Sequence, residues 1–118
     1  MDILVTNNPL VQEQYQSTFR VAFLDTDLFG ILIHVRDMVH KGYILKTHPL
    51  TGSIKPNESP YKSIIISGKR AEIDTQSVGI IGDCIEVLKK FPPKNFNKKY
   101  KHDMQIIDLS FIQATQGN

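Results

Sequence analysis

The sequence predicts an α/β fold: a three-layer α/β/α sandwich whose helices cover both faces of a mainly parallel sheet of about five strands. Two observations predict this fold. Short apolar segments alternate with longer segments whose apolar residues recur at helical spacing. The chain has 118 residues, of which 41% are hydrophobic and 22% charged, so its length and composition fit one globular domain spanning residues 1–118.

The first three elements are read from the N-terminal part of the chain. Residues 2–6 (DILVT) form a nearly continuous apolar run, which is typical of a strand buried on both faces. Asn8 is a favourable N-cap and Pro9 a favourable first helical residue, so a helix is predicted over residues 9–17. Residues 19–24 (FRVAFL) then predict a second strand.

The best-patterned element is a helix over residues 27–41. Asp25 and Thr26 are suited to cap its beginning, and Gly42 is suited to end it. Its buried stripe at helical spacing consists of Leu28, Ile31, Leu32, Val35, Met38 and Val39.

The remaining elements follow a long loop. Residues 43–47 (YILKT) predict a third strand, which enters the loop, and residues 63–67 (SIIIS) predict a fourth, which leaves it. A helix capped by Asp74 or Thr75 comes next and is stopped by two consecutive prolines. Apolar residues alternate with polar ones over residues 107–111, which predicts a final strand, with a helix as the alternative.

The loop at residues 47–62 (THPLTGSIKPNESPYK) is the candidate functional segment. Segments of this length without secondary structure are uncommon in small domains and are usually functional or disordered. Its three prolines favour a rigid, shaped loop. Its glycine, hydroxyls and lysines suit the binding of an anion or a small polar ligand.

In parallel sheets, ligands bind beyond the carboxyl ends of the strands, and the first strand and the long loop are expected to meet at that edge. Asparagines at a helix start, a Gly-Ser pair and two lysines would hold a small anion there. His48 and Ser53 are the candidates for a catalytic role, should the protein be an enzyme. The predicted ligand-binding residues are Asn7, Asn8, His48, Gly52, Ser53, Lys55 and Lys62.

Positive charge is concentrated near the C-terminus, although the net charge is only +2. Between Val87 and His102 there are six lysines and no acidic residue, interleaved with aromatic residues. Such a segment could contact RNA or an acidic protein, but charge runs mark solvated surfaces just as readily. Nucleic acid is therefore the less favoured partner.

The rest of the sequence excludes several classes of protein. Cys84 is the only cysteine, which rules out an internal disulfide, fits a reducing cytoplasm and leaves no cysteine-rich metal site. Its helical neighbours are apolar, so we expect a buried, unreactive thiol. No signal peptide, membrane span, nucleotide-binding glycine motif or hydrolase motif is visible. We expect no cofactor, no metal and no membrane association.

Three segments resemble the GrdX family, small proteins encoded alongside the glycine, sarcosine and betaine reductase systems of anaerobic amino-acid fermenters. They are VTNNPLV (5–11), VRDMVHKG (35–42) and THPLTGSIKPNESPYKS (47–63). The resemblance implies a cytoplasmic accessory protein of such a reductase system, where acyl phosphates and thioester-bound carbon are the relevant chemistry. It supplies no catalytic residues.

Two functions of different classes follow. The first is a non-catalytic protein whose loop binds a small anion or phosphorylated ligand, with protein components of the reductase as further partners. The second is a small enzyme acting on an acyl or phosphoryl substrate through His48 or Ser53. An enzyme should bury His48 against a positioned hydroxyl or carboxylate, whereas a binding protein need not. The sequence leaves open whether the chain forms a homo-oligomer.

Overall fold

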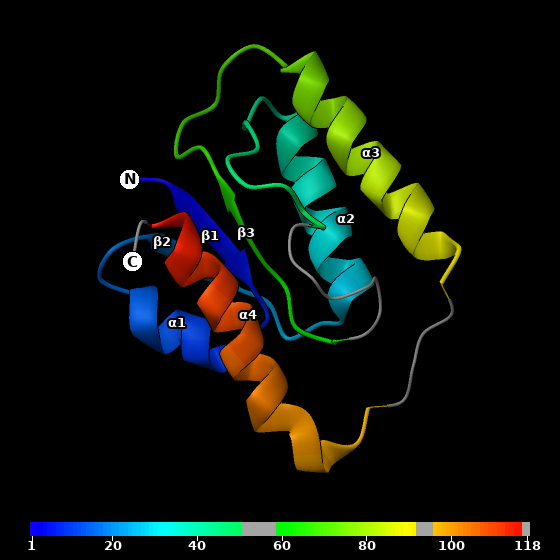
Figure 1. Cartoon of the computed structure of the whole chain (residues 1–118). Helices are drawn as coiled ribbons and strands as arrows, with labels where there is room; N and C mark the ends of the chain where they lie inside the picture. The colour runs from blue at the N-terminus through cyan, green and yellow to red at the C-terminus, as the bar shows by residue number, and fades with distance from the viewer. Residues whose placement is uncertain (51–58, 92–95, 117–118) are drawn as a thin grey trace.

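The computed structural model describes residues 1–50, 59–91 and 96–116 (Figure 1). Its elements in chain order are β1 (Ile3–Thr6), α1 (Pro9–Tyr15), β2 (Arg20–Phe23), α2 (Leu28–His40), β3 (Ser63–Ile66), α3 (Thr75–Lys89), the 3-10 helix η1 (Lys98–Tyr100) and α4 (Lys101–Thr115).

The sheet is smaller than predicted and mixed in direction. Over the described residues it has three strands in the order β2-β1-β3, with β1 parallel to β2 and antiparallel to β3. At the carboxyl end of β1, Thr6 lies opposite Phe23 on one side and Ser63 on the other. The prediction of a mainly parallel sheet of about five strands is therefore wrong.

The predicted strand at residues 43–47 lies beside β3 but forms only one isolated bridge, between Leu45 and Ile66. Two backbone bonds join the segments, from the Lys46 N–H to the Ile65 carbonyl and from the Ser67 N–H to the Ile44 carbonyl, both at 2.8 Å. The two donors that would complete the ladder bind hydroxyls instead: the Ile44 N–H donates to Ser67 Oγ at 2.9 Å, and the Ile65 N–H donates to Thr47 Oγ1 at 3.0 Å. Because these hydroxyls satisfy the backbone groups locally, regular pairing does not propagate along the segment.

The predicted final strand at residues 107–111 is part of helix α4. The residues that α4 buries are Gln105, Asp108 and Ile112, at helical spacing, whereas Ile106 is 45% exposed and Ile107 39% exposed. Two of the three buried positions are polar, so the apolar residues alone did not trace the buried face. The alternation of apolar and polar residues therefore misled the assignment.

Helices lie on both faces of the sheet, with α2 and α3 on one side and α1 and α4 on the other (Figure 1). Alternate strand residues point to opposite faces. Thus Ile3 and Val5 join the core beneath α2 and α3, while Leu4 joins the core beneath α1 and α4. Tyr15 and Phe19 close this second core with an edge-to-face ring contact, 5.7 Å between centroids.

The helix ends are set by local chemistry, largely as predicted. Asn8 caps α1 and Asp74 caps α3, but α2 is capped by Asp27, not by Asp25 or Thr26. Gly42 ends α2 with φ of 105°, a backbone conformation that favours glycine.

Cys84 lies on the buried face of α3 within the core that α2 and α3 share, as predicted. Burial raises the pKa of its thiol, and the neighbouring Asp83 carboxylate adds to this effect. None of the described helices is long and apolar enough to cross a membrane.

Candidate functional site

A cluster of buried polar side chains lies at the carboxyl end of β1. Its members come from β1, the start of α1, the start of β3 and the middle of α4. Each has at most 8% of its surface exposed, which is unusual for polar residues. They are Thr6, Asn8, Ser63, Gln105 and Asp108.

A directional chain of hydrogen bonds connects four of these side chains, those of Thr6, Asn8, Ser63 and Asp108. The Asn8 backbone N–H donates to Thr6 Oγ1 at 3.0 Å, and the hydroxyls of Thr6 and Ser63 are 2.7 Å apart. Ser63 Oγ donates to Asp108 Oδ2 at 2.7 Å, so Thr6 is the donor in its bond with Ser63. Asn8 Nδ2 also donates to Asp108 Oδ2, at 3.0 Å. The donors thus converge on one carboxylate oxygen.

The two charged groups of the site are both perturbed by burial. Burial raises the pKa of Asp108, and the hydrogen bonds from Asn8 and Ser63 and the charge of Lys62 only partly oppose this. Burial lowers the pKa of Lys62, with the Asp108 carboxylate opposing the shift. The low-polarity surroundings therefore disfavour the charged form of each group.

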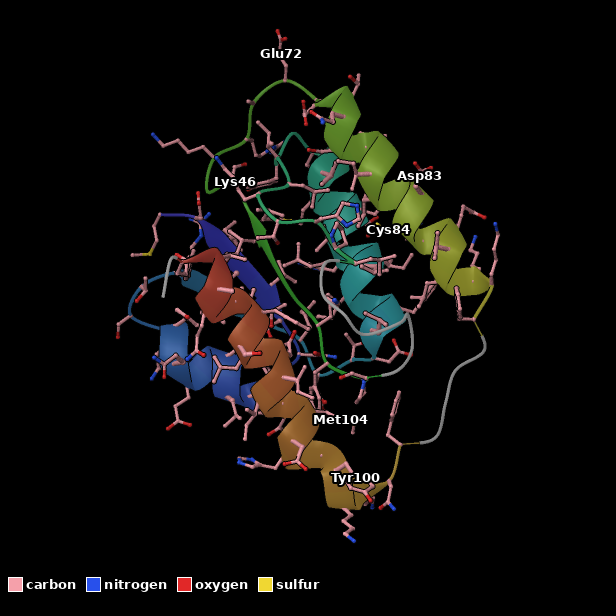
Figure 2. All side chains as sticks on the ribbon, in the orientation of Figure 1. Lys46, Glu72, Asp83, Cys84, Tyr100 and Met104 are labelled. Atoms are coloured by element: carbon pink, nitrogen blue, oxygen red, sulfur yellow. The ribbon has the colours of Figure 1, made fainter. Side chains whose placement is uncertain are left out.

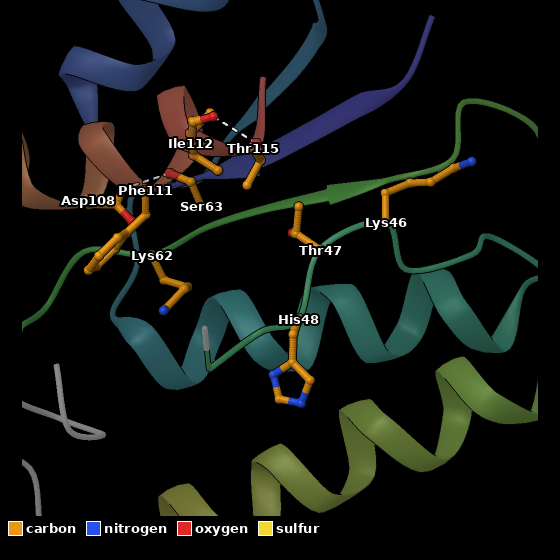
Figure 3. A pocket seen from close by; sticks show the side chains of 9 residues that line it. All are labelled: Lys46, Thr47, His48, Lys62, Ser63, Asp108, Phe111, Ile112 and Thr115. Carbon is orange, nitrogen blue, oxygen red and sulfur yellow. Dashed lines mark hydrogen bonds between the residues drawn. The ribbon is translucent and has the colours of Figure 1, made fainter. Parts of the chain in front are cut away.

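A hollow of about 180 Å³ opens beside the cluster (Figure 3). Lys62 reaches into it from the start of β3, and Asp108 lies on its α4 side. Over the described part of the chain, no carboxylate forms a direct ion pair with Lys62. The lining residues are Lys46, Thr47, His48, Lys62, Ser63, Asp108, Phe111, Ile112 and Thr115.

His48 lines the rim of this hollow and bonds to its own loop. It is exposed, and its ring points away from Asp108 (Figure 3). Its Nδ1 accepts a hydrogen bond from the Leu50 N–H at 3.1 Å, so its Nε2 carries the proton. Its printed hydrogen bond is to its own loop, so a catalytic role for His48 stays a prediction.

Asn7 joins the end of the long loop to the carboxyl end of β1. Its Nδ2 donates to the carbonyls of Thr26 at 2.9 Å and Pro60 at 2.8 Å, and its Oδ1 accepts from the Lys62 N–H at 2.9 Å. The first strand and the loop therefore meet, as expected, but through the antiparallel strand β3. Asn7 positions the backbone of Lys62, and direct contact between its side chain and a ligand stays a prediction.

The side chain of Asn8 is also occupied. Its Oδ1 accepts from the Leu10 N–H at 3.1 Å, and its Nδ2 is shared between Asp108 and the Gln105 carbonyl. Because Asn8 is fully buried, we assign it to holding Asp108 in place. Its predicted contact with a ligand is likewise untested.

Three predicted binding residues, Gly52, Ser53 and Lys55, lie outside the described residues. The sequence did not indicate Asp108, the acceptor at the centre of the cluster, because residues 107–111 read as a strand. A helical reading would have placed Gln105, Asp108 and Ile112 on one face.

In the part of the chain that the structure describes, no three His, Cys, Asp or Glu side chains are placed to hold one metal ion.

A family model described as GrdX-like protein matches residues 3–116. No curated protein and no solved structure matches the chain.

Proposed function

We propose that this chain, which belongs to the GrdX-like family, is a cytoplasmic accessory protein of an amino-acid reductase system and binds a small anion. The reductase association extends the family assignment. The anion site is argued from the hollow at Lys62.

The observation that carries the anion proposal is the environment of Lys62. Removing an ammonium group from water is costly unless an opposite charge or hydrogen bonds compensate. Lys62 has no direct ion-pair partner within the described residues, and burial lowers its pKa. A bound carboxylate or phosphate would supply the missing negative charge.

Among the described residues, Asp108 forms no direct ion pair with Lys62. Its Oδ2 already accepts hydrogen bonds from Asn8 and Ser63. The lining also contains Lys46 and His48. The hollow as a whole therefore favours an anion over a cation.

The size of the hollow and the number of donors limit both ligand and affinity. A volume of about 180 Å³ suits a group such as phosphate, acetyl phosphate or a short carboxylate. Charge-assisted hydrogen bonds contribute about 1.5–3 kcal/mol each. Two of them give a total near the roughly 4 kcal/mol of a millimolar dissociation constant.

Calorimetric titration with phosphate, sulfate, acetate and acetyl phosphate tests the proposal. We expect Lys62→Met to abolish binding and the matched exposed variant Lys69→Met to leave it unchanged. Asp108→Asn removes a negative charge, so it should tighten anion binding. Ser53→Ala and Lys55→Ala test the two predicted loop residues in the same assay.

At alkaline pH, towards the ordinary lysine value of 10.5, binding should also be coupled to proton uptake, because an anion beside Lys62 favours its ammonium form. Heats measured in two buffers of different ionisation enthalpy would reveal this uptake. The site is not at Lys62 if no anion binds below about 10 mM, a range that already corresponds to only a few kcal/mol. Unchanged binding by Lys62→Met would be equally decisive.

The reductase association requires a separate test. Purified protein components of glycine, sarcosine or betaine reductase would be titrated with this chain, with and without acetyl phosphate. We expect binding to at least one component. If none binds under either condition, the accessory role is refuted, while the anion site stands or falls on calorimetry.

The alternative of a small enzyme has less support. It relied on His48 or Ser53, and His48 is exposed with its hydrogen bond made to its own loop. A nucleophile and a base within hydrogen-bond reach would be the expected arrangement. Ser53 lies outside the described residues.

A further inference from the structure

A second hollow, of about 400 Å³, lies beside the segment that precedes Lys62. Pro60 and Tyr61 form part of its wall, and Phe96 lines it as well. Lys98, Lys101 and Met104 complete it from η1 and the beginning of α4. Figure 2 shows Met104 one turn along α4 from Tyr100.

The Pro60–Tyr61 wall is held in place by hydrogen bonds. The Tyr61 hydroxyl accepts from Gln105 Nε2 at 3.0 Å, and the Pro60 carbonyl accepts from Asn7 Nδ2 at 2.8 Å. Gln105 is itself buried beside the polar cluster. This wall is therefore ordered before any ligand arrives, which reduces the entropy lost on binding.

The aromatic rings at this hollow do not pack on each other. A ring–ring contact lies elsewhere, between Tyr15 and Phe19 in the core. Tyr61 and Phe96 line the same hollow without such a contact to each other. Stacking of a flat ligand group on either ring would therefore not have to break a contact between these two rings.

The charge at the hollow is one-sided. Lys98 and Lys101 line it, and neither forms an ion pair within the described residues. Lys99 lies next to them, with its Nζ 5.7 Å from the centroid of the Tyr100 ring. An anionic group is therefore favoured at this end of the hollow.

We propose that this hollow is a second binding site, for a small aromatic anion: a planar ring carrying a phosphate or carboxylate group. The ring would stack at Tyr61 and Phe96, and the anionic group would contact Lys98 and Lys101. The volume falls within the roughly 300–1,000 Å³ typical of ligand pockets. This site is lined by other residues than the hollow at Lys62, and titrating the Lys62→Met variant, which lacks the site proposed above, separates the two.

AMP is a suitable probe, because it combines a flat base with a phosphate. We would titrate it by NMR against the full chain and follow the side-chain amide of Gln105, whose partner is Tyr61. Adenosine and inorganic phosphate, titrated separately, measure the two halves of the ligand. We expect AMP to bind at least about tenfold more tightly than either half, since stacking and charge pairing act together.

Variants identify the site. Phe96→Leu should weaken AMP binding about tenfold through lost stacking, and Lys98→Gln combined with Lys101→Gln should weaken it to the level of adenosine. Tyr61→Leu should act like Phe96→Leu, but it also removes the acceptor for Gln105, so Phe96→Leu is the cleaner measurement. Phe29→Leu and Lys69→Gln, both away from the hollow, serve as matched controls and should bind AMP normally.

Several outcomes would overturn the proposal. Phosphate binding as tightly as AMP would mean that the rings contribute nothing. AMP binding that survives Phe96→Leu would place the ligand elsewhere. Much tighter binding of a single-stranded oligoribonucleotide or an acidic peptide at the same residues would make this face a docking surface for a macromolecule. Absence of AMP binding at 10 mM would end the hypothesis.

Discussion

Replacing Asp108 by alanine should destabilise the protein substantially, because this carboxylate accepts two buried hydrogen bonds on Oδ2. Asn8 Nδ2 keeps its bond to the Gln105 carbonyl. The hydroxyls of Ser63 and Thr6 then have two protons but only their mutual contact, so one proton is left without an acceptor. Hydrogen bonds to charged groups contribute about 1.5–3 kcal/mol each, and the relief of carboxylate burial offsets part of that.

The expected loss in the free energy of unfolding is therefore about 2–4 kcal/mol, a large share of the roughly 5–15 kcal/mol of a typical domain. Asp108→Asn separates the hydrogen bonds from the charge. Its amide oxygen can accept from both Ser63 and Asn8 while the buried negative charge disappears. We expect this variant to lie within about 1 kcal/mol of the wild type at neutral pH.

The raised pKa of Asp108 determines whether the free energy of unfolding rises or falls with pH. Because burial raises the folded-state pKa of Asp108 above its ordinary value of 3.8, the folded state binds more protons than the unfolded state above that value. The stabilising contribution is fully present below pH 3.8 and is lost as the pH rises through the folded-state pKa. The difference in stability between the wild type and Asp108→Asn should change by at most about 1.4 kcal/mol per pH unit, in favour of the variant.

Urea denaturation of the wild type, Asp108→Ala and Asp108→Asn between pH 4 and pH 8 measures all three effects, with the slope m checked for two-state behaviour. Comparing two variants at one position keeps the contributions of other titrating groups nearly constant. The reasoning is refuted if Asp108→Asn loses as much stability as Asp108→Ala. It is also refuted if the wild type gains stability relative to Asp108→Asn as the pH rises.

Three further predictions concern other parts of the fold. Gly42→Ala should destabilise the protein by about 1–2 kcal/mol or more, because φ is 105° and a Cβ would meet the Ala71 carbonyl. Gly79→Ala, where a Cβ on α3 would enter open space, should stabilise it by about 0.5–1 kcal/mol. Thermal denaturation compares the two variants. Cys84 should react with a bulky thiol reagent only as fast as the protein opens, and rapid labelling of the folded state would disprove its burial. Burial lowers the folded-state pKa of Lys62, so burying its ammonium costs stability below that pKa, and this cost is relieved as the pH rises towards 10.5. Lys62→Met should remove this alkaline gain in the free energy of unfolding. An unchanged dependence of stability on pH would contradict the prediction.

Interactions between residues close together in the sequence explain which parts of the fold could be predicted. The strands β1 and β3 are short runs of apolar residues bounded by polar ones, and α2 has an apolar stripe at helical spacing. Asn8 and Asp74 act as N-caps because their side chains reach backbone N–H groups only two or three residues away. These features depend on nearby residues, so the sequence alone determined them.

Strand pairing and the true periodicity of the C-terminal segment were decided by tertiary contacts. Residues 43–47 have a strand-like composition, yet the hydroxyls of Ser67 and Thr47 take backbone donors that would have extended the ladder. Over residues 107–111, apolar and polar residues alternate by chance, although the segment belongs to a helix whose buried face is partly polar.

Three of the residues that the sequence grouped at one edge, Asn7, Asn8 and Lys62, lie together at the carboxyl end of β1, because Asn7 binds the backbone of Lys62 across the sheet edge. Their binding of a ligand stays a prediction. Asp108 is 100 residues from its partner Asn8, and no local pattern connects them. A buried carboxylate is tolerated only where distant donors converge on it, and that convergence exists only once α4 has packed against α1 and β3.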